Sequence, residues 1–366
     1  MIERLFVDNF RTLVNFEVQF DAIALLLGGN GSGKSTVLDV VQALHRFVAG
    51  AGAVTELFPP GTLTRWQSLN EQAFEIDVRS SLGLYRYALR LEHAADRRRC
   101  RARVESLTLD GQPLFEFTDG KIQLYNDQHD PGPSMTFDWS RSGLSMVQSG
   151  VSNTKLTEFK RRLLGIVFLR PCPPVMDTDS KEEVEELDRL ATNFPSWYRF
   201  IARLDISRQL KLFQSLKEAI DGFESLRIEG PADSTVTLRV AIRPKGAAEA
   251  VSFKFSELSD GERQLILLYA VLYGMADETR ILFLDEPDNF LALSEIEPWL
   301  NSLIDAAGDT IGQAIVVSHH PELIDSLARE KGVWLGRDSG GPTRVEAGRV
   351  KDTEPLKPSE FVARGW

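Results

Sequence analysis

The segment that constrains this chain most is GGNGSGKST at Gly28–Thr36, which has the spacing G-x-x-x-x-G-K-[ST] of a phosphate-binding loop. An aliphatic strand is expected directly before it, over 22–27, and an amphipathic helix directly after it. Glycines let successive backbone N–H groups point inward around phosphates, and the N-terminus of the helix adds its positive end. A glycine turn that only caps a helix explains less, because strand, loop and helix occur together. The segment predicts an α/β nucleotide-binding unit.

Two segments carry residues suited to phosphate and magnesium. In the glycine loop, Lys34 is expected to reach the β- and γ-phosphates as a point charge, and the Ser35 hydroxyl to ligate Mg²⁺. Further along, ILFLDEPDN at Ile281–Asn289 is an apolar run that ends in adjacent carboxylates, where α/β sheets place ligands. Asp285 is expected to hold magnesium through Ser35 or a water, and Glu286 to activate the attacking water. Acids that only add solubility at a strand end are the alternative.

A histidine pair follows a third apolar run, in VVSHHPE at Val316–Glu322. A histidine at such a strand end can hydrogen-bond a γ-phosphate or its attacking water. We favour His319, because His320 immediately precedes Pro321 and is expected to begin the next helix. A histidine pair that serves only as a helix cap or a loop stays open as the alternative.

The segment LSDGERQ at Leu258–Gln264 is expected to begin a helix. Ser259 fits an N-cap, and Glu262, three residues later, fits its capping-box partner. Capping does not explain Gly261 in the first helical turn, where glycine costs about 1 kcal/mol relative to alanine. A bare helix N-terminus with a close backbone approach is what a phosphate needs, so this turn is a second candidate phosphate contact.

Four motifs in one order, GGNGSGKS, LSDGE, LFLDEPDN and SHHP, resemble the nucleotide-binding heads of the ABC ATPase superfamily, in particular the soluble SMC-like and RecF-like branch with its OLD-type, AAA-family members. The opening IERLFVDNFRTLVNFEVQF is similar to the N-terminal hairpin of that branch, whose arginine approaches the nucleotide, and Arg11 is the matching position. The resemblance covers roughly residues 1–50 and 250–340. It implies an α/β fold, an ABC ATPase head with a two-lobed mixed sheet.

The resemblance also implies a head-to-tail homodimer that binds and hydrolyses ATP with Mg²⁺ between the glycine loop of one chain and the LSDGE signature of the other. Ser259 and Gly261 would contact the γ-phosphate in trans, and His319 would act as a switch. Hydrolysis is expected to be slow in a monomer, because no chain holds both halves of its own site. Asp288 and Asn289 match the segment that crosses the dimer interface. The residues implied for the cradle are Gly28, Asn30, Gly31, Ser32, Gly33, Lys34, Ser35 and Thr36.

The chain departs from the family pattern in two places. Asp260 stands where transporter signatures commonly have glycine, and the long separation between glycine loop and signature also argues against a transporter ATPase. The glutamine-bearing loop that touches magnesium in this family is not identifiable. Gln67 and Gln72 are weak candidates for it.

The residues between the motifs predict the remaining architecture. Alternating residues over 74–124 predict an antiparallel β subdomain, 127–152 is expected to be a loop, and GIVFLRP is expected to contain a core strand. Charged, helically periodic residues over 180–223 predict two or three helices as a short insertion in place of a coiled coil. Two strands and then alternating helices and parallel strands are expected after it. The expected domains are 1–175 as the N-terminal lobe, 176–228 as the helical insertion, and 229–366 as the C-terminal lobe.

Composition limits the class of protein. The 366 residues carry a net charge of −11 and are 43% hydrophobic, which favours a large core over a chain coated in nonspecific nucleic-acid contacts. Charged residues in the first twenty positions argue against a secretory signal, and the longest aliphatic run is far too short to span a membrane. Cys100 and Cys172 lack metal-ligand spacing. We expect a cytoplasmic protein without a membrane partner.

Two biological roles stay open. SHHPE after a short helical insertion resembles RecF-like ATPases of antiphage defence, and the short stretch after His319 leaves no space for a nuclease domain, so we expect a separate, nuclease-like effector. The alternative is a DNA-repair or chromosome-maintenance ATPase that acts directly on DNA. DNA contact would use a row of arginines on one strand face, although a solvated strand face is the commoner meaning of such a row: Arg97, Arg99, Arg101 and Arg103.

Overall fold

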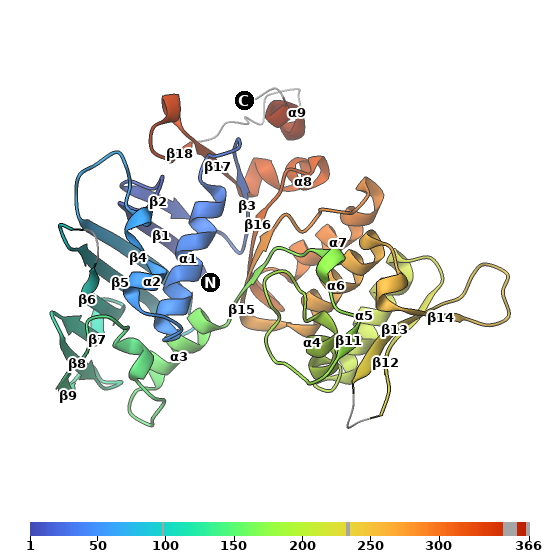
Figure 1. Cartoon of the computed structure of the whole chain (residues 1–366), viewed down its shortest axis with the longest axis horizontal. Coiled ribbons are helices and arrows are strands. Elements are labelled where there is room, and N and C mark those ends of the chain that lie inside the picture. Colours follow the sequence, from blue (N-terminus) through green and yellow to red (C-terminus); the bar gives the residue numbers. More distant parts are fainter. Residues whose placement is uncertain (97–98, 232–234, 347–356, 364–366) are drawn as a thin grey trace. The chain divides into compact units, whose positions relative to one another are not determined.

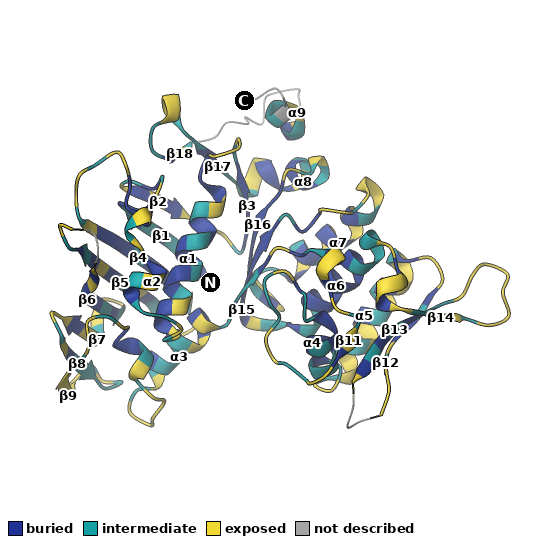
Figure 2. Cartoon of the chain, in the orientation of Figure 1, coloured by how far each residue is buried: buried dark blue, intermediate teal, exposed yellow. Residues whose placement is uncertain are grey.

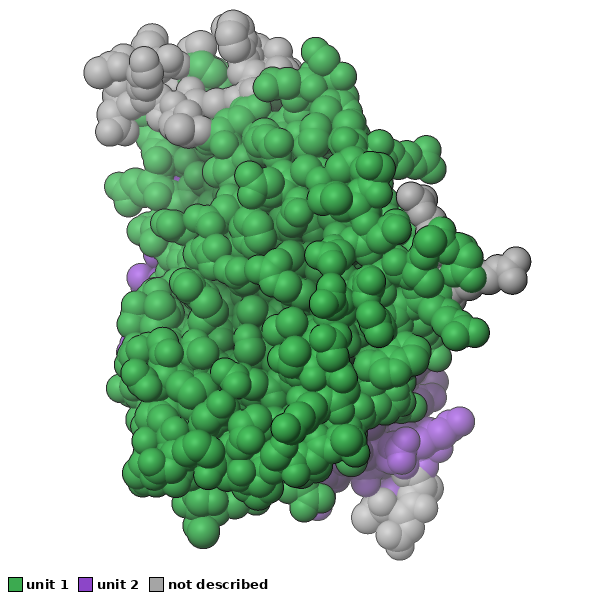
Figure 3. All heavy atoms as spheres, turned by 90° about the vertical axis from the view of Figure 1, so that its left-hand side faces the viewer, with its two compact units in different colours: residues 1–166, 328–366 green, residues 167–327 purple. Residues whose placement is uncertain are grey.

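The computed structural model describes residues 1–96, 99–231, 235–346 and 357–363. The chain forms two compact units, the first made of residues 1–166 and 328–366 and the second of residues 167–327 (Figure 3). The first unit therefore joins segments from both ends of the chain. The three-part domain division expected from the sequence stays a prediction.

An antiparallel sheet of eight strands dominates the first unit (Figure 1). The predicted alternation of buried and exposed residues is confirmed in β5, whose side chains are buried at every second position. One prediction is wrong: the segment 127–152 is not all loop, because β9 lies in it. This strand is wholly exposed at the sheet edge, where a proline without an N–H is tolerated. In spatial order the strands are β2 (Phe16–Gln19), β1 (Ile2–Asp8), β4 (Glu71–Ser80), β5 (Gly83–His93), β6 (Cys100–Leu109), β7 (Gln112–Thr118), β8 (Lys121–Tyr125) and β9 (Pro131–Thr136).

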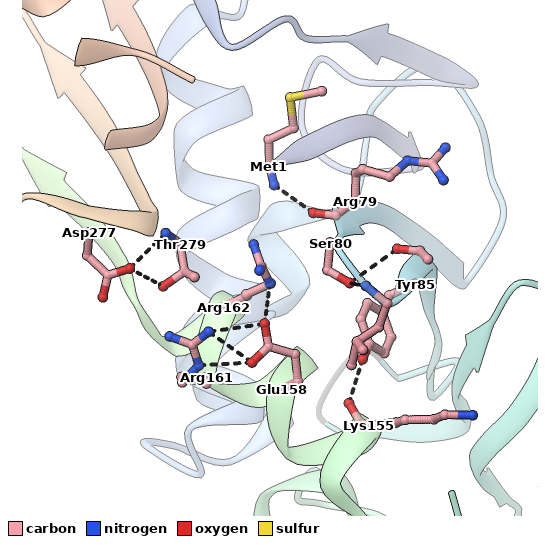
Figure 4. Close-up of polar contacts among 12 residues, drawn as sticks. Met1, Arg79, Ser80, Tyr85, Lys155, Glu158, Arg161, Arg162, Asp277 and Thr279 are labelled. Atoms are coloured by element: carbon pink, nitrogen blue, oxygen red, sulfur yellow. Dashed lines mark hydrogen bonds and ion pairs between the residues drawn. The ribbon is translucent and has the colours of Figure 1, made fainter. Parts of the chain in front are cut away.

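Aromatic side chains fix three helices to this sheet: α1 (Lys34–Val48), α2 (Val54–Leu57) and α3 (Thr154–Leu164). Phe47 of α1 packs edge-on against Phe58, which contacts Phe74 of β4 with ring centroids 5.1 Å apart. On α3, Phe159 stacks on Tyr87 of β5. Figure 4 shows Glu158 of α3 paired with Arg161 and Arg162, and the Tyr85 hydroxyl of β5 donating to the backbone of the same helix.

The strand that leads into the glycine loop is β3 (Ile23–Leu27), and every one of its residues is buried. Parallel to it runs β17 (Gly332–Gly336), which pairs in turn with the antiparallel β18 (Arg344–Glu346). A fully buried strand needs apolar residues on both faces, which is why IALLL shows no alternation. The predicted order of strand, glycine loop and helix α1 is confirmed.

In the second unit, parallel strands and helices alternate as predicted. β15 (Asp277–Asp285) pairs in parallel with β16 (Ile311–Val317), and the helices between and around them are α6 (Asp260–Gly274), α7 (Leu293–Ala306) and α8 (Pro321–Lys331). β10 (Ile166–Leu169) is the other neighbour of β15, and Phe168 stacks on Phe283 across the two strands. Both β15 and β16 are largely buried (Figure 2).

The insertion contains two helices, which agrees with the two or three that the sequence predicts. Helices α4 (Phe194–Ile201) and α5 (Ile206–Ala219) form, but 180–193 holds no helix. The reason is Asp188, whose carboxylate accepts hydrogen bonds from the backbone N–H groups of Leu190, Thr192 and Asn193 and so replaces helical bonds with a turn. A four-stranded sheet accompanies these helices, and the sequence did not predict its strand β12. The strands of this sheet are β11 (Asp179–Ser180), β12 (Phe223–Glu229), β13 (Val236–Ile242) and β14 (Val251–Lys254).

Candidate functional site

The glycine loop has a backbone that only glycine adopts without strain. Gly28, Gly31 and Gly33 have φ angles of 144°, 75° and 110°. A Cβ on Gly28 would lie 2.2 Å from the carbonyl oxygen of Leu335, and one on Gly33 would lie 2.5 Å from the Thr343 hydroxyl. The loop is therefore a tight backbone cradle at the N-terminus of α1, as its sequence predicts.

Side chains in the loop suit a phosphate group. The ammonium of Lys34 is folded back on the loop and donates to the carbonyl oxygens of Gly28 at 2.6 Å and Gly29 at 3.2 Å. The buried hydroxyl of Ser32 has no hydrogen-bond partner among the described residues. An unpaired buried polar atom is costly, and a phosphate oxygen would satisfy it. Ser35 lies exposed in the first turn of α1, so its hydroxyl is open to a metal ion.

A segment from the far end of the chain braces the loop, which the sequence did not reveal. The hydroxyl of Thr343, which is fully buried, donates to the Ser32 carbonyl at 2.8 Å and lies 2.9 Å from the Thr12 hydroxyl. Arg337 donates to the carbonyl of Gly31 at 3.1 Å, and its guanidinium lies over the ring of Trp66, 5.1 Å from the centroid. No local pattern marks either residue, because both contacts are made across more than 300 positions of sequence.

Arg11, the predicted nucleotide-approaching arginine, lies beside the helix that begins in the loop. Its guanidinium forms an ion pair with Asp39 of α1 and covers the ring of Phe10, 5.4 Å from the centroid. The backbone N–H of Arg11 donates to the carbonyl of Thr62. This places Arg11 near the first turns of α1, while its contact with a nucleotide stays a prediction.

The two predicted carboxylates lie at the end of β15 in the second unit. Asp285 is buried, with 6% of its side chain exposed, and burial raises its pKa against the opposing effects of Arg170 and Arg189. Glu286 is half-buried and has a left-handed backbone, with φ of 53°. Its carboxylate accepts from Asn289 at 3.2 Å. A carboxylate pair at the end of a parallel strand is a donor set that Mg²⁺ prefers.

Two arginines that the sequence did not single out face this carboxylate pair. Arg170, directly after β10, donates to Glu286 at 3.2 Å, and its Nε lies 3.9 Å from Asp285. Arg189 reaches Asp285 at 3.3 Å. The backbone N–H of Arg170 donates to the carbonyl of Arg189 at 2.7 Å, so the two arginines lie on hydrogen-bonded neighbouring segments of the backbone.

The loop after the carboxylates contacts the segment that carries the histidines. Asp288 is buried, which raises its pKa, and the Ser318 hydroxyl opposes that rise through a hydrogen bond. His320 begins α8 as predicted: its Nδ1 accepts from the N–H of Glu322 at 3.3 Å. His319 is exposed and open to a ligand. Its assignment as a switch stays a prediction.

The signature turn forms the predicted capping box. The Ser259 hydroxyl accepts from the N–H of Glu262 at 3.2 Å, and the Glu262 carboxylate accepts from the N–H of Ser259 at 2.9 Å. The exposed Ser259 remains open to a partner. Gly261 has a reason inside its own unit as well, since a Cβ there would lie 3.0 Å from the carbonyl oxygen of Phe290. The close neighbour of Gly261 in the structure is therefore a backbone carbonyl, and the approach of a phosphate to this turn stays a prediction.

Two weaker predictions lose support. Gln72 is fully buried and donates to the Asn9 carbonyl and the Thr62 hydroxyl, so its amide serves the interior of the first unit. Gln67 donates to Asp8 at 3.1 Å.

The arginine row is not an open positive surface. Arg101 forms an ion pair with Glu92 of the adjacent strand β5 at 2.6 Å. Arg103 lies 3.3 Å from Glu71 and 3.6 Å from Asp119. Arg99 is exposed, and Arg97 lies outside the described residues. Acidic partners neutralise Arg101 and Arg103, which weakens the case for contact with a phosphate backbone.

Comparison with known proteins gives the fold. Residues 177–325 match a family model described as "AAA domain, putative AbiEii toxin, Type IV TA system", which covers less than half of the chain. An SMC head solved with the C-terminal winged-helix domain of ScpA has a TM-score of 0.56 at 13% identity, over 94% of this chain and 97% of that one. The SMC head of Thermotoga maritima has a TM-score of 0.51 at 16% identity, over 95% and 99%. No curated protein matches the chain in sequence.

These similarities confirm the predicted fold class, a mixed α/β fold with a large antiparallel sheet like that of the SMC heads. Among the described residues, no helix has the length and apolar character needed to cross a membrane.

Proposed function

We propose that the chain is a Mg²⁺-dependent ATPase that closes as a homodimer around ATP. The observation that carries this proposal is the glycine cradle, with its folded-back Lys34 and the unpaired, buried hydroxyl of Ser32. In this proposal the nucleotide supplies the phosphates and Mg²⁺ polarises them. Lys34 leaves its two carbonyl partners to bind the β- and γ-phosphates, and Ser35 and Asp285 hold the metal.

Glu286 is the proposed base. Its carboxylate is half-buried and already accepts a hydrogen bond from Asn289, so part of its freedom is lost before it accepts a proton from the attacking water. His319, exposed after β16, is proposed to contact the γ-phosphate. Arg11 is proposed to approach the same nucleotide from the first unit.

Dimerisation follows from the signature turn. Ser259 is exposed and its hydroxyl is held by the capping box at the start of α6, where the helix N-terminus favours an incoming anion. We propose that Ser259 and Gly261 meet the γ-phosphate held by a second copy, next to Asp288. A Cβ at residue 261 would crowd the carbonyl oxygen of Phe290 whether or not a phosphate binds. Gly261 is therefore weaker evidence for a phosphate contact than Ser259.

The experiment is Glu286→Gln, which keeps the shape of the side chain and removes its capacity to take a proton. The variant is expected to accumulate as an ATP-bound dimer, seen by light scattering at saturating ATP and Mg²⁺. Glu297→Gln on the exposed side of α7 is the matched control and is expected to turn over like the wild type. A Glu286→Gln chain that binds ATP yet stays monomeric would remove the shared-site proposal.

We propose further that the ATP-bound dimer gates a separate, nuclease-like effector in antiphage defence. The description of the matched family model, which names a putative toxin, supports this role. The ion pairs of Arg101 and Arg103 with acidic side chains weaken the support for direct action on DNA. Phage plating on cells that carry the chain with its gene neighbours tests the role, and plaque counts equal to those on cells without it would count against it.

A further inference from the structure

The carboxylates of Asp285 and Glu286 are met by two guanidinium groups, those of Arg170 and Arg189. The contacts are Arg170 to Glu286 at 3.2 Å and Arg189 to Asp285 at 3.3 Å, with Arg170 also 3.9 Å from Asp285. The two negative charges are thus balanced by two positive ones. Since the side chain of Asp285 is only 6% exposed, its charge would be costly without such partners.

Backbone structure fixes the direction of both arginines. Arg170 and Arg189 are joined by an N–H to carbonyl hydrogen bond of 2.7 Å, and the N–H of Cys172 donates to the carbonyl of Leu190 at 3.1 Å. The neighbouring Asp188 holds its own turn, because its carboxylate accepts hydrogen bonds from the hydroxyl of Thr192 and from three backbone N–H groups, those of Leu190, Thr192 and Asn193. Two guanidiniums presented by such a braced pair of segments are less free than ordinary surface arginines.

The heads of these arginines remain partly open, although their partners are buried. The exposed fractions of the side chains are 53% for Arg170 and 35% for Arg189. A guanidinium can therefore leave its carboxylate without unfolding its segment. It offers a planar fork of N–H donors that matches phosphate oxygens as well as carboxylates.

Resting on the proposed function, we propose that Arg170 and Arg189 are exchangeable counter-ions of the Asp285–Glu286 pair. They compete with a divalent cation for these carboxylates while nucleotide is absent. When Mg·ATP binds, Asp285 would hold its cation beside Glu286, and the released guanidiniums would bind phosphate oxygens. The exchange keeps charge balanced, because the divalent cation would offset the two carboxylates and the two arginines would pair with the phosphates.

Opposite effects on two affinities distinguish this exchange from a static ion pair. Arg170→Gln and Arg189→Gln are each expected to tighten the binding of Mn²⁺ to the nucleotide-free protein and to weaken the binding of Mg·ATP. We expect changes of roughly three- to tenfold in each direction, because the arginines are partly exposed. A static pair that only supports the loop would leave both affinities unchanged or weaken both.

Mn²⁺ affinity is measured by electron paramagnetic resonance of the free ion, and Mg·ATP affinity with a fluorescent ATP analogue. Arg203→Gln is the matched control, since Arg203 pairs with Glu183 in the same unit and is 72% exposed, and it is expected to change neither affinity. The tightening of Mn²⁺ binding should vanish when Asp285→Asn is added to Arg189→Gln. Tightening that survives in this double variant would overturn the proposal.

Lysine variants keep the test decisive if a glutamine variant does not fold. Arg170→Lys and Arg189→Lys retain the charge without the fork, so Mn²⁺ binding should stay near that of the wild type while Mg·ATP binding weakens. Unchanged Mg·ATP binding in both would overturn the inference. Failure of the wild type to bind Mg·ATP at all would instead refute the proposed function, whereas normal wild-type binding and hydrolysis with unaltered Mn²⁺ affinity in the glutamine variants would refute only the exchange.

Discussion

Thr343→Val removes one hydroxyl from the brace of the glycine loop and leaves a side chain of nearly the same shape. The lost hydroxyl donates to the Ser32 carbonyl at 2.8 Å, in a place where Thr343 is fully buried. A trans peptide directs its N–H away from its C=O, so holding the Ser32 carbonyl also aims the N–H of Gly33 away from Thr343. We expect the substitution to loosen the loop as well as destabilise the first unit.

The magnitude follows from the carbonyl left behind. A buried acceptor that loses its donor costs about 1–3 kcal/mol, and the Thr12 hydroxyl at 2.9 Å loses a neighbour in addition. A loss near 2 kcal/mol corresponds to a fall in Tm of roughly 4–8 °C for a unit of this size. If the ATP-bound state is destabilised by about 1 kcal/mol more than the free folded state, half of that cost again, ATP affinity drops by roughly fivefold.

Calorimetric unfolding and equilibrium binding of a fluorescent ATP analogue measure the two effects on Thr343→Val. Thr237→Val is the matched control, because the Thr237 hydroxyl donates to an exposed Asp179 at 2.7 Å, and removing it should change Tm little. Thr343→Ser keeps the donor and should retain most of the ATP affinity. Equal Tm and equal ATP affinity in Thr343→Val and the wild type would refute the reasoning.

Two further predictions concern the second unit. Ser259→Arg is expected to abolish hydrolysis while ATP binding to the glycine loop stays near the wild-type value, because Ser259 lies outside that loop; equal loss of binding and turnover would contradict its role. Asp188→Asn is expected to lower stability near neutral pH: burial alone would raise the pKa of Asp188, but hydrogen bonds from Thr192 and its neighbours hold it below the ordinary value. The wild-type stabilisation is therefore present above the unfolded-state pKa and lost as pH falls through the folded-state pKa. Urea unfolding curves of the two proteins should converge in acid. A difference in unfolding free energy that persists in acid would contradict this role of Asp188.

Predictions from sequence succeeded where the signal was local. The capping box joins Ser259 and Glu262 within one helical turn, and the order of strand, glycine loop and helix is written in adjacent residues. Period-two patterning likewise gave the antiparallel sheet, because each strand presents one face to the helices that cover it. Such features depend on neighbours three or four positions away, which a sequence displays directly.

Features that depend on distant partners were missed. Thr343 reaches Ser32 across 311 positions, and Arg170 meets Glu286 across 116, with no periodicity to mark either residue. The charged residues 180–193 form no helix for a different reason. Their spacing is helical, but Asp188 offers the backbone a competing set of hydrogen bonds, which a pattern of hydrophobic residues does not reveal.

The start of α6 contacts the loop that follows the proposed base, and this joins the two halves of the mechanism within one chain. Gln264, buried in the second turn of α6, donates from its amide to the Pro287 carbonyl at 2.6 Å, and Gly261 leaves room for the carbonyl of Phe290. Asn289 in the same loop donates to Glu286. If a second copy draws the Ser259 turn toward its own γ-phosphate, the displacement acts on residues 287–290 and so on the orientation of Glu286. A chain built in this way would adjust the orientation of its own base when its signature turn is engaged, which gives a physical reason for slower hydrolysis in the monomer than in the dimer.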